Sequence, residues 1–367
     1  MLTIEGFLDT VRQNVSRKDI PKIIVTGNDS ADLDSIISSL LFAYLSYLND
    51  TSTLYLPLIK VPRDDLELRP ELKYVFEETQ LDYHQLICID DLDWDALTCP
   101  RIVLVDHNHL TAPFHTPVWH DRVVGVLDHH VDEKLYLDAP LRVVEMVGSC
   151  VTLVLEQFPE EAWIHHTQVT QLALAPLLVD TVNLKWELGR TTEKDVALFE
   201  KLKTRQAGLI DNQYFKAIEH VKSKVDTMSS YHILRRDYKE FIVKGYRIGT
   251  SAVTWYFHAW AERDSPQEIE QAAKKYTQER QLDMEVIFTA FDHDKEGAGD
   301  YKRQLAVMVC DPKLKVVQEA LETTDQVQLT RIDALQTDSL TFYDQGNVRM
   351  SRKQVWPLVK ELIESKL

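Results

Sequence analysis

The fold of this 367-residue chain is decided by the stretch Gly27-Asn28-Asp29-Ser30-Ala31-Asp32-Leu33-Asp34-Ser35. An apolar run at residues 23–25 precedes this stretch, and residues 35–48 are apolar nearly all round. A buried strand, an acidic turn and a buried helix in succession indicate the first half of a βαβ unit. We expect the N-terminus of this helix to point toward the acidic turn and any phosphate bound there.

Three further polar motifs follow apolar runs in the same way. They are Asp106-His107-Asn108, Asp128-His129-His130 and Asp180-Thr181-Val182-Asn183, after runs at 102–105, 123–127 and 174–179. The last run favours a helix, and the other two favour parallel strands, whose carboxyl ends form the ligand-binding edge of open α/β sheets. Carboxylates and imidazoles gathered at one edge are what a two-metal phosphoryl-transfer centre requires.

The whole chain predicts a two-domain α/β protein. Residues 1–190 are expected to form a metal-binding catalytic domain with a parallel sheet, which includes further strands at 53–59, 86–89 and 142–146. Residues 191–224 indicate a helical linker and hinge, where Thr192 and Asp195 could cap a helix. Residues 225–367 predict a smaller α/β domain that binds substrate, with the active site in the cleft between the domains. Its expected elements are strands at 241–243, 246–251, 284–291 and 304–310, a helix at 266–280 and an exposed loop at 292–300.

Composition and charge limit the partners of the chain. The 41 basic and 58 acidic residues give a net charge of −17, which argues against nucleic acid as a partner. A phosphate substrate stays open, since divalent cations held by carboxylates present positive charge. The chain has no run long enough to span a membrane and no signal-peptide pattern, so we expect no membrane partner. Four scattered cysteines suit a reducing compartment, and a cytoplasmic location is expected.

Each motif taken alone has a simpler explanation. Asp32 stands where a helix N-cap is common, and Asp106 stands where a turn favours aspartate. Adjacent histidines such as those of Asp128-His129-His130 are most often a surface pair, which is what we expect of His165-His166. Asp180 could be a helix-terminal turn residue, although burying a carboxylate without a partner is costly. The combination of motifs is what predicts a metal site.

Basic residues near the C-terminus could supply the positive charge that the acidic motifs lack. Arg352 and Lys353 precede a final amphipathic helix, where a planar guanidinium and an ammonium group could clamp phosphate. A pair of solvent-exposed charges is an equally good explanation from the sequence alone. The same two explanations apply to Lys239 and to Lys302-Arg303.

The ordered motifs resemble those of the DHH phosphoesterases. The resemblance rests on Gly27-Asn28-x-x-x-Asp32-x-Asp34-Ser35, Asp106-His107-Asn108, Asp128-His129-His130 and Asp180-Thr181. Ser351-Arg352-Lys353-Gln354-Val355 is similar to the second-domain (DHHA2) signature of the branch that contains family II inorganic pyrophosphatases and exopolyphosphatases. Within that branch the chain most resembles eukaryotic cytosolic exopolyphosphatases of the fungal type, with prune-like proteins as relatives.

The resemblance implies hydrolysis of the terminal phosphoanhydride of linear inorganic polyphosphate, with release of orthophosphate. Two divalent cations would be held by Asp32, Asp34, Asp106, His129 and Asp180. The catalytic residues would be Asp106, as the bridging ligand, and His130. His130 would bind the attacked phosphoryl group and stabilise or protonate the leaving oxygen. The substrate would also be bound by Asn28, His107, Lys239, Lys302, Arg303, Arg352 and Lys353.

Asn28 departs from the family II pyrophosphatases, which carry histidine at this position. An amide is a weaker ligand than an imidazole, so the change favours Mg²⁺ over Mn²⁺ or Co²⁺ as the cation. Whether Asn28 touches a metal stays open, and we favour a hydrogen bond to the substrate or to a metal-bound water.

Two other functions stay open. The same centre could serve an inorganic pyrophosphatase, or the chain could be a prune-like phosphodiesterase or interaction protein. The branch that carries oligoribonucleases and cyclic-dinucleotide phosphodiesterases is disfavoured, because its second domain has a glycine pair and none of the 11 glycines here adjoins another. A monomer is expected.

Overall fold

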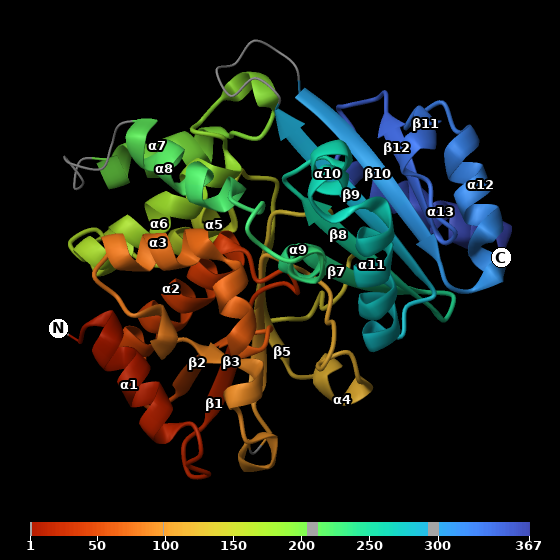
Figure 1. Ribbon diagram of the computed structural model, residues 1–367. Helices are drawn as coiled ribbons and strands as arrows, with labels where there is room; N and C mark the ends of the chain where they lie inside the picture. The colour runs from red at the N-terminus through yellow and green to blue at the C-terminus, as the bar shows by residue number, and fades with distance from the viewer. Residues whose placement is uncertain (1, 98, 204–211, 293–300) are drawn as a thin grey trace. The chain divides into compact units, whose positions relative to one another are not determined.

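The computed structural model describes residues 2–97, 99–203, 212–292 and 301–367. The chain divides into two compact units, Met1–Lys222 and Ser223–Leu367 (Figure 1). The predicted linker contains two helices, α7 (Glu193–Lys203) and α8 (Asn212–Ser223). Both belong to the first unit, except for the last residue of α8. Most of the loop predicted at 292–300 lies outside the described residues.

The first unit is built on a parallel sheet. Within the described residues its strands lie in the order β3 (Ile87–Cys88), β2 (Leu54–Ile59), β1 (Lys22–Thr26), β4 (Arg101–Val105), β5 (Val123–Asp128) and β6 (Leu141–Val144). Each pair of neighbouring strands is parallel. The side chains of β1 are all buried and those of β4 nearly so, as expected when helices cover the faces of a parallel sheet.

Helix α2 (Leu33–Asn49) is the central helix of this unit. Residues 33–46 are all buried, because α2 lies between the strands and helices α5 (Cys150–Glu156) and α6 (Thr167–Asp180) (Figure 1). Asp32 caps α2 by accepting a hydrogen bond from the backbone nitrogen of Ser35 at 3.0 Å. Other helices described in this unit are α1 (Ile4–Asn14), α3 (Pro70–Glu78) and α4 (Pro117–His120).

The second unit contains a mixed sheet. Its described strands lie in the order β11 (Leu329–Arg331), β12 (Leu340–Gln345), β10 (Tyr301–Val309), β9 (Met284–Asp292), β8 (Tyr246–Val253) and β7 (Tyr238–Val243). Strands β8 and β9 are parallel, and the other neighbours are antiparallel.

Side chains of the second sheet alternate between two cores. Ile287 and Ala306 enter one core, while Val286 and Leu305 enter the other. The first core is completed by helices α9 (Ser230–Arg236), α10 (Phe257–Asp264) and α11 (Pro266–Arg280), and the second by α12 (Lys315–Thr323) and α13 (Arg352–Lys366). Figure 1 shows these two groups of helices on opposite faces of the sheet.

The predicted fold class is confirmed: a domain with a parallel sheet precedes a smaller α/β domain. The helices predicted at 35–48 and 266–280 are α2 and α11, and the apolar run at 174–179 lies in α6. The strand predicted at 304–310 begins earlier, at Tyr301, because polar residues there pair with β9. No helix in the described part of the chain combines the length and apolar character that a membrane span needs.

Candidate metal centre

The polar motifs of the first unit meet where the strand order reverses. Strands β1 and β4 are neighbours, but the chain continues from β1 to β2 and β3 on one side and from β4 to β5 and β6 on the other. The loops after β1 and β4 therefore diverge and leave room for a ligand at the carboxyl ends of these strands. Across this point, Asn28 Nδ2 donates a hydrogen bond to Asp106 Oδ2 at 2.7 Å.

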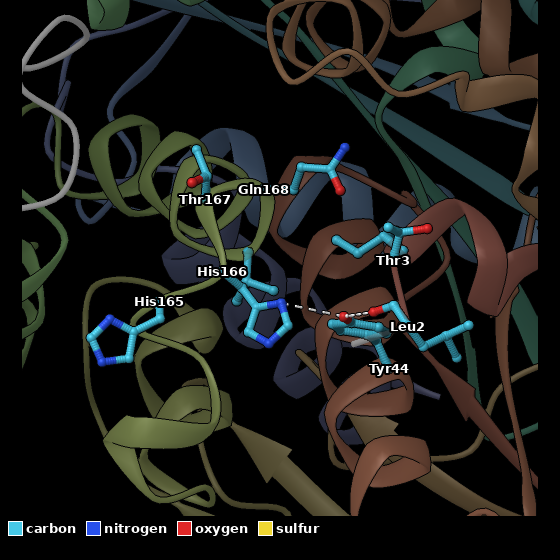
Figure 2. Close-up of a pocket in the computed structure, with 9 residues that line it drawn as sticks. Leu2, Thr3, Tyr44, His165, His166, Thr167 and Gln168 are labelled. Atoms are coloured by element: carbon cyan, nitrogen blue, oxygen red, sulfur yellow. Dashed lines mark hydrogen bonds between the residues drawn. The ribbon is translucent and has the colours of Figure 1, made fainter.

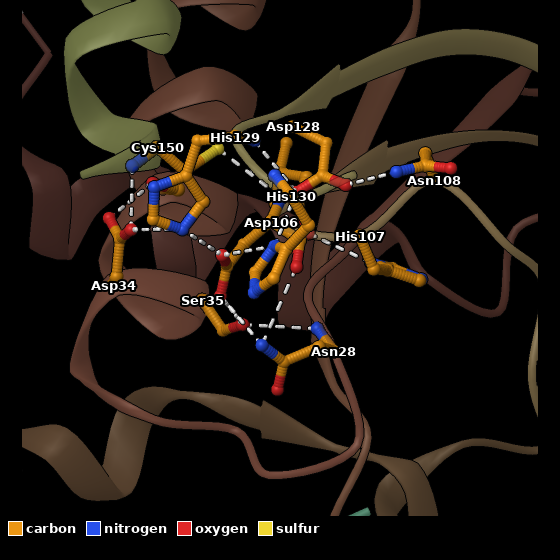
Figure 3. A network of polar contacts seen from close by, with 12 residues as sticks. Asn28, Asp34, Ser35, Asp106, His107, Asn108, Asp128, His129, His130 and Cys150 are labelled. Atoms are coloured by element: carbon orange, nitrogen blue, oxygen red, sulfur yellow. Dashed lines mark hydrogen bonds and ion pairs between the residues drawn. The ribbon is translucent and has the colours of Figure 1, made fainter. Parts of the chain in front are cut away.

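Asp106 is the centre of the cluster shown in Figure 3. Its carboxylate is 2% exposed, and Oδ2 also accepts a hydrogen bond from Ser35 Oγ at 2.6 Å. The other oxygen, Oδ1, lies 3.0 Å from His129 Nε2 and 3.6 Å from His130 Nδ1. Asp106 therefore joins three of the four motifs found in the sequence.

His129 is oriented by the loop that precedes α5. Its Nδ1 lies 3.0 Å from the carbonyl oxygen of Val147, which can only accept a hydrogen bond, so Nδ1 carries a proton. In the neutral ring Nε2 then presents a lone pair to Asp106 Oδ1, and two acceptors 3.0 Å apart require a proton or a cation between them. A histidine held in this way through its second nitrogen is typical of a metal ligand.

His130 is held by the buried carboxylate of Asp128. Asp128 Oδ1 accepts hydrogen bonds from His130 Nδ1 at 2.7 Å and from the backbone nitrogens of His129 and His130 at 2.8 and 3.2 Å. Asn108 Nδ2 donates to the other oxygen, Oδ2. Burial alone would raise the pKa of Asp128, but the hydrogen bond from His130 and its charge outweigh burial and hold the pKa below its ordinary value.

Asp34 is fixed by the first turn of α5. Its Oδ1 accepts hydrogen bonds from Ser149 Oγ at 2.8 Å and the Val151 nitrogen at 3.1 Å, and its Oδ2 accepts from the Cys150 nitrogen at 2.6 Å. Burial, followed by the charges of Asp180 and Asp106, raises the pKa of Asp34 well above its ordinary value.

The two remaining predicted ligands lie at helix ends. Asp32 is the N-cap of α2, so the simpler explanation of this residue is structurally correct, yet its charge also acts on Asp34 and Asp180. Asp180 is the last residue of α6, and among the described residues no donor reaches its buried Oδ2. Burial, followed by the charge of Asp32, raises the pKa of Asp180 to about 6.

This donor set fits a divalent cation. Ligand atoms of Asp106, His129 and His130 all lie within 4.8 Å of one another, and Asp34 Oδ2 lies 3.9 Å from His129 Nε2. The pKa values of Asp34 and Asp180 are raised in part by the negative charges of neighbouring carboxylates. Bound cations would neutralise this repulsion. Mixed carboxylate and imidazole ligands suit divalent metals such as manganese and zinc.

The predicted substrate ligand His107 lies apart from the other histidines. In Figure 3 its ring points away from His129 and His130, and its Nδ1 lies 2.8 Å from the Val105 carbonyl oxygen. Burial, followed by the nearby Lys60 charge, lowers the pKa of His107 to about 3, so the ring is neutral. A neutral ring cannot offer phosphate a full positive charge.

The predicted basic ligands belong to the second unit. Arg352 begins α13, and its guanidinium donates to the Asp237 carbonyl oxygen at 2.9 Å and to Asp237 Oδ1 at 2.7 Å. Lys353 is exposed, and Arg303 donates from Nε to the Val348 carbonyl oxygen at 2.9 Å. The remaining two predicted ligands are Lys239, which is half-buried, and Lys302, which is exposed.

The expectation that His165-His166 is a surface pair holds only for His165. His166 is half-buried, with its Nδ1 3.4 Å from Tyr44 Oη and the two rings edge to face. Both histidines line a pocket of about 240 Å³ where α1 and α6 begin (Figure 2). None of the predicted site residues lines this pocket.

The residues that hold the candidate ligands were not predicted from the sequence. Ser35 stands in the first motif, next to Asp34 and close to Asp32, so its position in the sequence could have indicated a contact with the candidate ligands. Ser149, Cys150 and Val147 contact the ligands from outside all four motifs, and their order in the sequence gives no sign of this.

The fold and the cluster define the class of protein. The sequence matches the family model described as "DHH family, N-terminal domain" over residues 22–179 and the "DHHA2 domain" model over residues 216–362. The chain belongs to the DHH family and carries a DHHA2 domain, which confirms the resemblance predicted from its motifs.

Two relatives cover more than nine-tenths of the chain, and a third covers 63% of it. Human "Exopolyphosphatase PRUNE1" is 29% identical over 353 residues, covering 94% of this chain and 76% of the relative. A Schizosaccharomyces pombe protein named "Putative exopolyphosphatase" is 28% identical, covering 93% of this chain and 90% of the relative. A "Manganese-dependent inorganic pyrophosphatase" from Methanothrix thermoacetophila is 25% identical, covering 63% of this chain and 69% of the relative.

A solved structure has the same two-domain fold. It is the crystal structure of the "Methanococcus jannaschii putative family II inorganic pyrophosphatase", with a TM-score of 0.65 and 19% sequence identity. The match covers 94% of this chain and 100% of the solved chain.

Proposed function

We propose that the protein is an exopolyphosphatase that removes the terminal phosphate of linear inorganic polyphosphate. The observation that carries the proposal is the group of buried Asp106, buried His129 and half-buried His130 at the reversal point of the parallel sheet. Two relatives that cover more than nine-tenths of the chain carry exopolyphosphatase in their names. Buried carboxylates and imidazoles gathered at one point suit metal-assisted hydrolysis.

Two divalent cations would be held by Asp32, Asp34, Asp106, His129 and Asp180. Such cations lower the pKa of water and polarise a phosphoryl oxygen when they are bound. Asp106 would bridge them, since Asn28 and Ser35 orient one oxygen of its carboxylate while the other faces His129. We favour Mg²⁺, because an amide at position 28 leaves one imidazole fewer for a softer metal.

His130 would bind the attacked phosphoryl group and protonate the leaving oxygen. The Asp128 carboxylate accepts from His130 Nδ1 at 2.7 Å and so stabilises positive charge on the ring. The ring would therefore meet the phosphoryl group through Nε2 and deliver its proton from that atom. Asn28 and His107 would bind the substrate through hydrogen bonds, because neither side chain carries a positive charge.

Positive charge for the rest of the polyphosphate would come from Lys239, Lys302, Arg303, Arg352 and Lys353. Phosphoryl transfer depends largely on positioning and charge neutralisation, so these side chains would lower KM for long chains most. We further propose a monomer in the cytoplasm; the four cysteines are all thiols, as a reducing compartment would keep them.

The test is phosphate release from long-chain polyphosphate and from pyrophosphate, each with Mg²⁺ and with Mn²⁺. We expect kcat/KM to be higher for polyphosphate, with Mg²⁺ as the better cation. A strong preference for pyrophosphate with Mn²⁺ would refute the proposal. It would favour the second candidate, an inorganic pyrophosphatase, which the shared fold with the Methanococcus structure and the Methanothrix relative support.

A further inference from the structure

One short segment holds three candidate metal ligands at once. This segment, residues 147–152, runs from the loop before α5 into its first turn. It contacts His129 through the Val147 carbonyl oxygen, Asp34 through Ser149 Oγ and the nitrogens of Cys150 and Val151, and the Asp106 nitrogen through Cys150 Sγ at 3.2 Å. Figure 3 shows Cys150 beside both Asp34 and His129. A shift of this segment would therefore move several ligands together.

Asp195 holds the same segment at two points. Its Oδ2 accepts a hydrogen bond from the Gly148 nitrogen at 2.7 Å, and its Oδ1 accepts from Thr152 Oγ1 at 2.8 Å. The Asp195 side chain is fully buried. The residues that hold Asp34 lie between these two anchor points, and the residue that holds His129 adjoins one of them.

The packing around Gly148 leaves the segment little freedom. A Cβ at position 148 would lie 2.5 Å from the Arg190 carbonyl oxygen and from Thr181 Cγ2, and 2.9 Å from Asp195 Oδ2. Thr181 follows the candidate ligand Asp180 directly. Arg190, Thr181 and Asp195 thus pack so closely against position 148 that only glycine fits there.

We propose that Asp195 is a positioning residue of the metal centre, which sets the 147–152 segment and through it His129 and Asp34. This inference rests on the proposed function. Asp195 also forms a capping box with Thr192, whose nitrogen and Oγ1 donate to Asp195 Oδ2 at 2.8 and 2.7 Å. A helix cap needs only the contacts with Thr192, whereas the contacts with Gly148 and Thr152 link α7 to the site.

The chemistry of the four donors predicts which substitution is tolerated. An asparagine at position 195 can keep its oxygen toward the Gly148 and Thr192 nitrogens, and its NH₂ group can donate to the Thr152 hydroxyl, which can also accept. An alanine can do neither and leaves the Gly148 nitrogen buried without its acceptor. The two variants therefore separate loss of the anchor from loss of the charge.

The experiment measures Mn²⁺ binding by calorimetry to the full chain, as wild type, Asp195→Ala and Asp195→Asn, with circular dichroism to confirm folding. We expect Asp195→Ala to bind Mn²⁺ about 10- to 100-fold more weakly, as is usual when a group supporting a metal ligand is lost. Asp195→Asn should bind within about threefold of wild type. Thr3→Ala is the matched control, because it removes the capping side chain of α1, a helix of 11 residues like α7. The affinity of this variant for Mn²⁺ should equal that of wild type.

Each outcome has one meaning. If Asp195→Ala is folded and binds Mn²⁺ like wild type, Asp195 is only a helix cap and the inference fails. If Asp195→Ala does not fold, Thr152→Val decides, because it removes one anchor and leaves the contacts with Thr192 in place; unchanged affinity in that variant overturns the inference. If wild type itself binds no Mn²⁺ or Mg²⁺, the proposed function fails first.

Discussion

Asp128→Asn changes one carboxylate oxygen into an NH₂ group, and the surrounding contacts decide which one. Oδ1 faces three donors, the backbone nitrogens of His129 and His130 and the His130 Nδ1, so the amide oxygen stays there. The new NH₂ group then faces Asn108 Nδ2, which is also a donor. The side-chain amide of Asn108 cannot flip to exchange its oxygen and nitrogen. Its Nδ2 donates to the Val131 carbonyl oxygen at 3.0 Å, and its Oδ1 accepts from the Glu133 nitrogen at 2.9 Å.

The magnitude follows from these contacts. Losing a hydrogen bond to a charged group costs about 1.5–3 kcal/mol, and leaving a buried donor unsatisfied costs about 1–3 kcal/mol. We therefore expect Asp128→Asn to lower the free energy of unfolding of the first unit by about 3 kcal/mol. We also expect kcat to fall about 100-fold or more, because His130 loses the charge that stabilises its protonated ring and general acid catalysis contributes about 10²–10⁴-fold.

A second variant separates the two effects. In Asn108→Asp/Asp128→Asn the new carboxylate at position 108 accepts from both the Glu133 nitrogen and the new amide. It can no longer donate to the Val131 carbonyl oxygen, so only part of the lost stability should return. The ring of His130 still lacks its charged partner, so kcat should stay low. Urea denaturation and polyphosphate hydrolysis measure the two quantities. A folded Asp128→Asn with near-normal kcat, or a swap that restores kcat together with stability, would refute the reasoning.

Three further predictions concern other parts of the chain. Burial raises the pKa of Glu285 from 4.5 to about 7, so between these pH values the folded second unit binds more protons than the unfolded one. The free energy of unfolding of the second unit should therefore fall by about 3 kcal/mol as pH rises. Glu285→Gln keeps an acceptor for Ser251 and should abolish this fall in urea titrations at pH 5 and 8; equal falls in both proteins would contradict the assignment. Asn28→His should shift the preferred cation from Mg²⁺ toward Mn²⁺, measured as the cation concentration that gives half-maximal hydrolysis, and an unchanged ratio would argue against a role for Asn28 in metal choice. Removing divalent cations with EDTA should abolish hydrolysis, and adding Mg²⁺ should restore it. The free energy of unfolding of the first unit should be about 3 kcal/mol lower with EDTA than with the cation at 100 times its Kd. Activity that survives EDTA would exclude a metal mechanism.

The sequence predicted the first sheet and its motifs well because both depend on local patterns. Unbroken apolar runs define β1, β4 and β5, and each polar motif follows its run directly, so the strand ends and candidate ligands were found together. Helix α2 was predicted for the same reason. Asp32 could be read as a cap or as a ligand, and the structure shows that it caps α2 while its charge reaches Asp34 and Asp180.

Contacts between distant segments could not be predicted. The Thr192–Asp195 capping box was expected from its spacing, but the bonds from Asp195 to Gly148 and Thr152 depend on how α7 packs against the loop before α5. The ion pair of Arg352 with Asp237 likewise joins residues that are far apart in sequence. Such contacts follow from tertiary packing, and no periodicity or local motif encodes them.

The strand order of the first sheet also determines when the candidate metal centre can form during folding. Asn28 and Asp106 meet only after β1 pairs with β4, and residues 27–100, which include β2 and β3, lie between these strands. Closing so long a loop for a parallel pairing is slow, and the ligands are scattered until it is complete. Added cations should therefore leave the refolding rate of the first unit unchanged and act by slowing its unfolding.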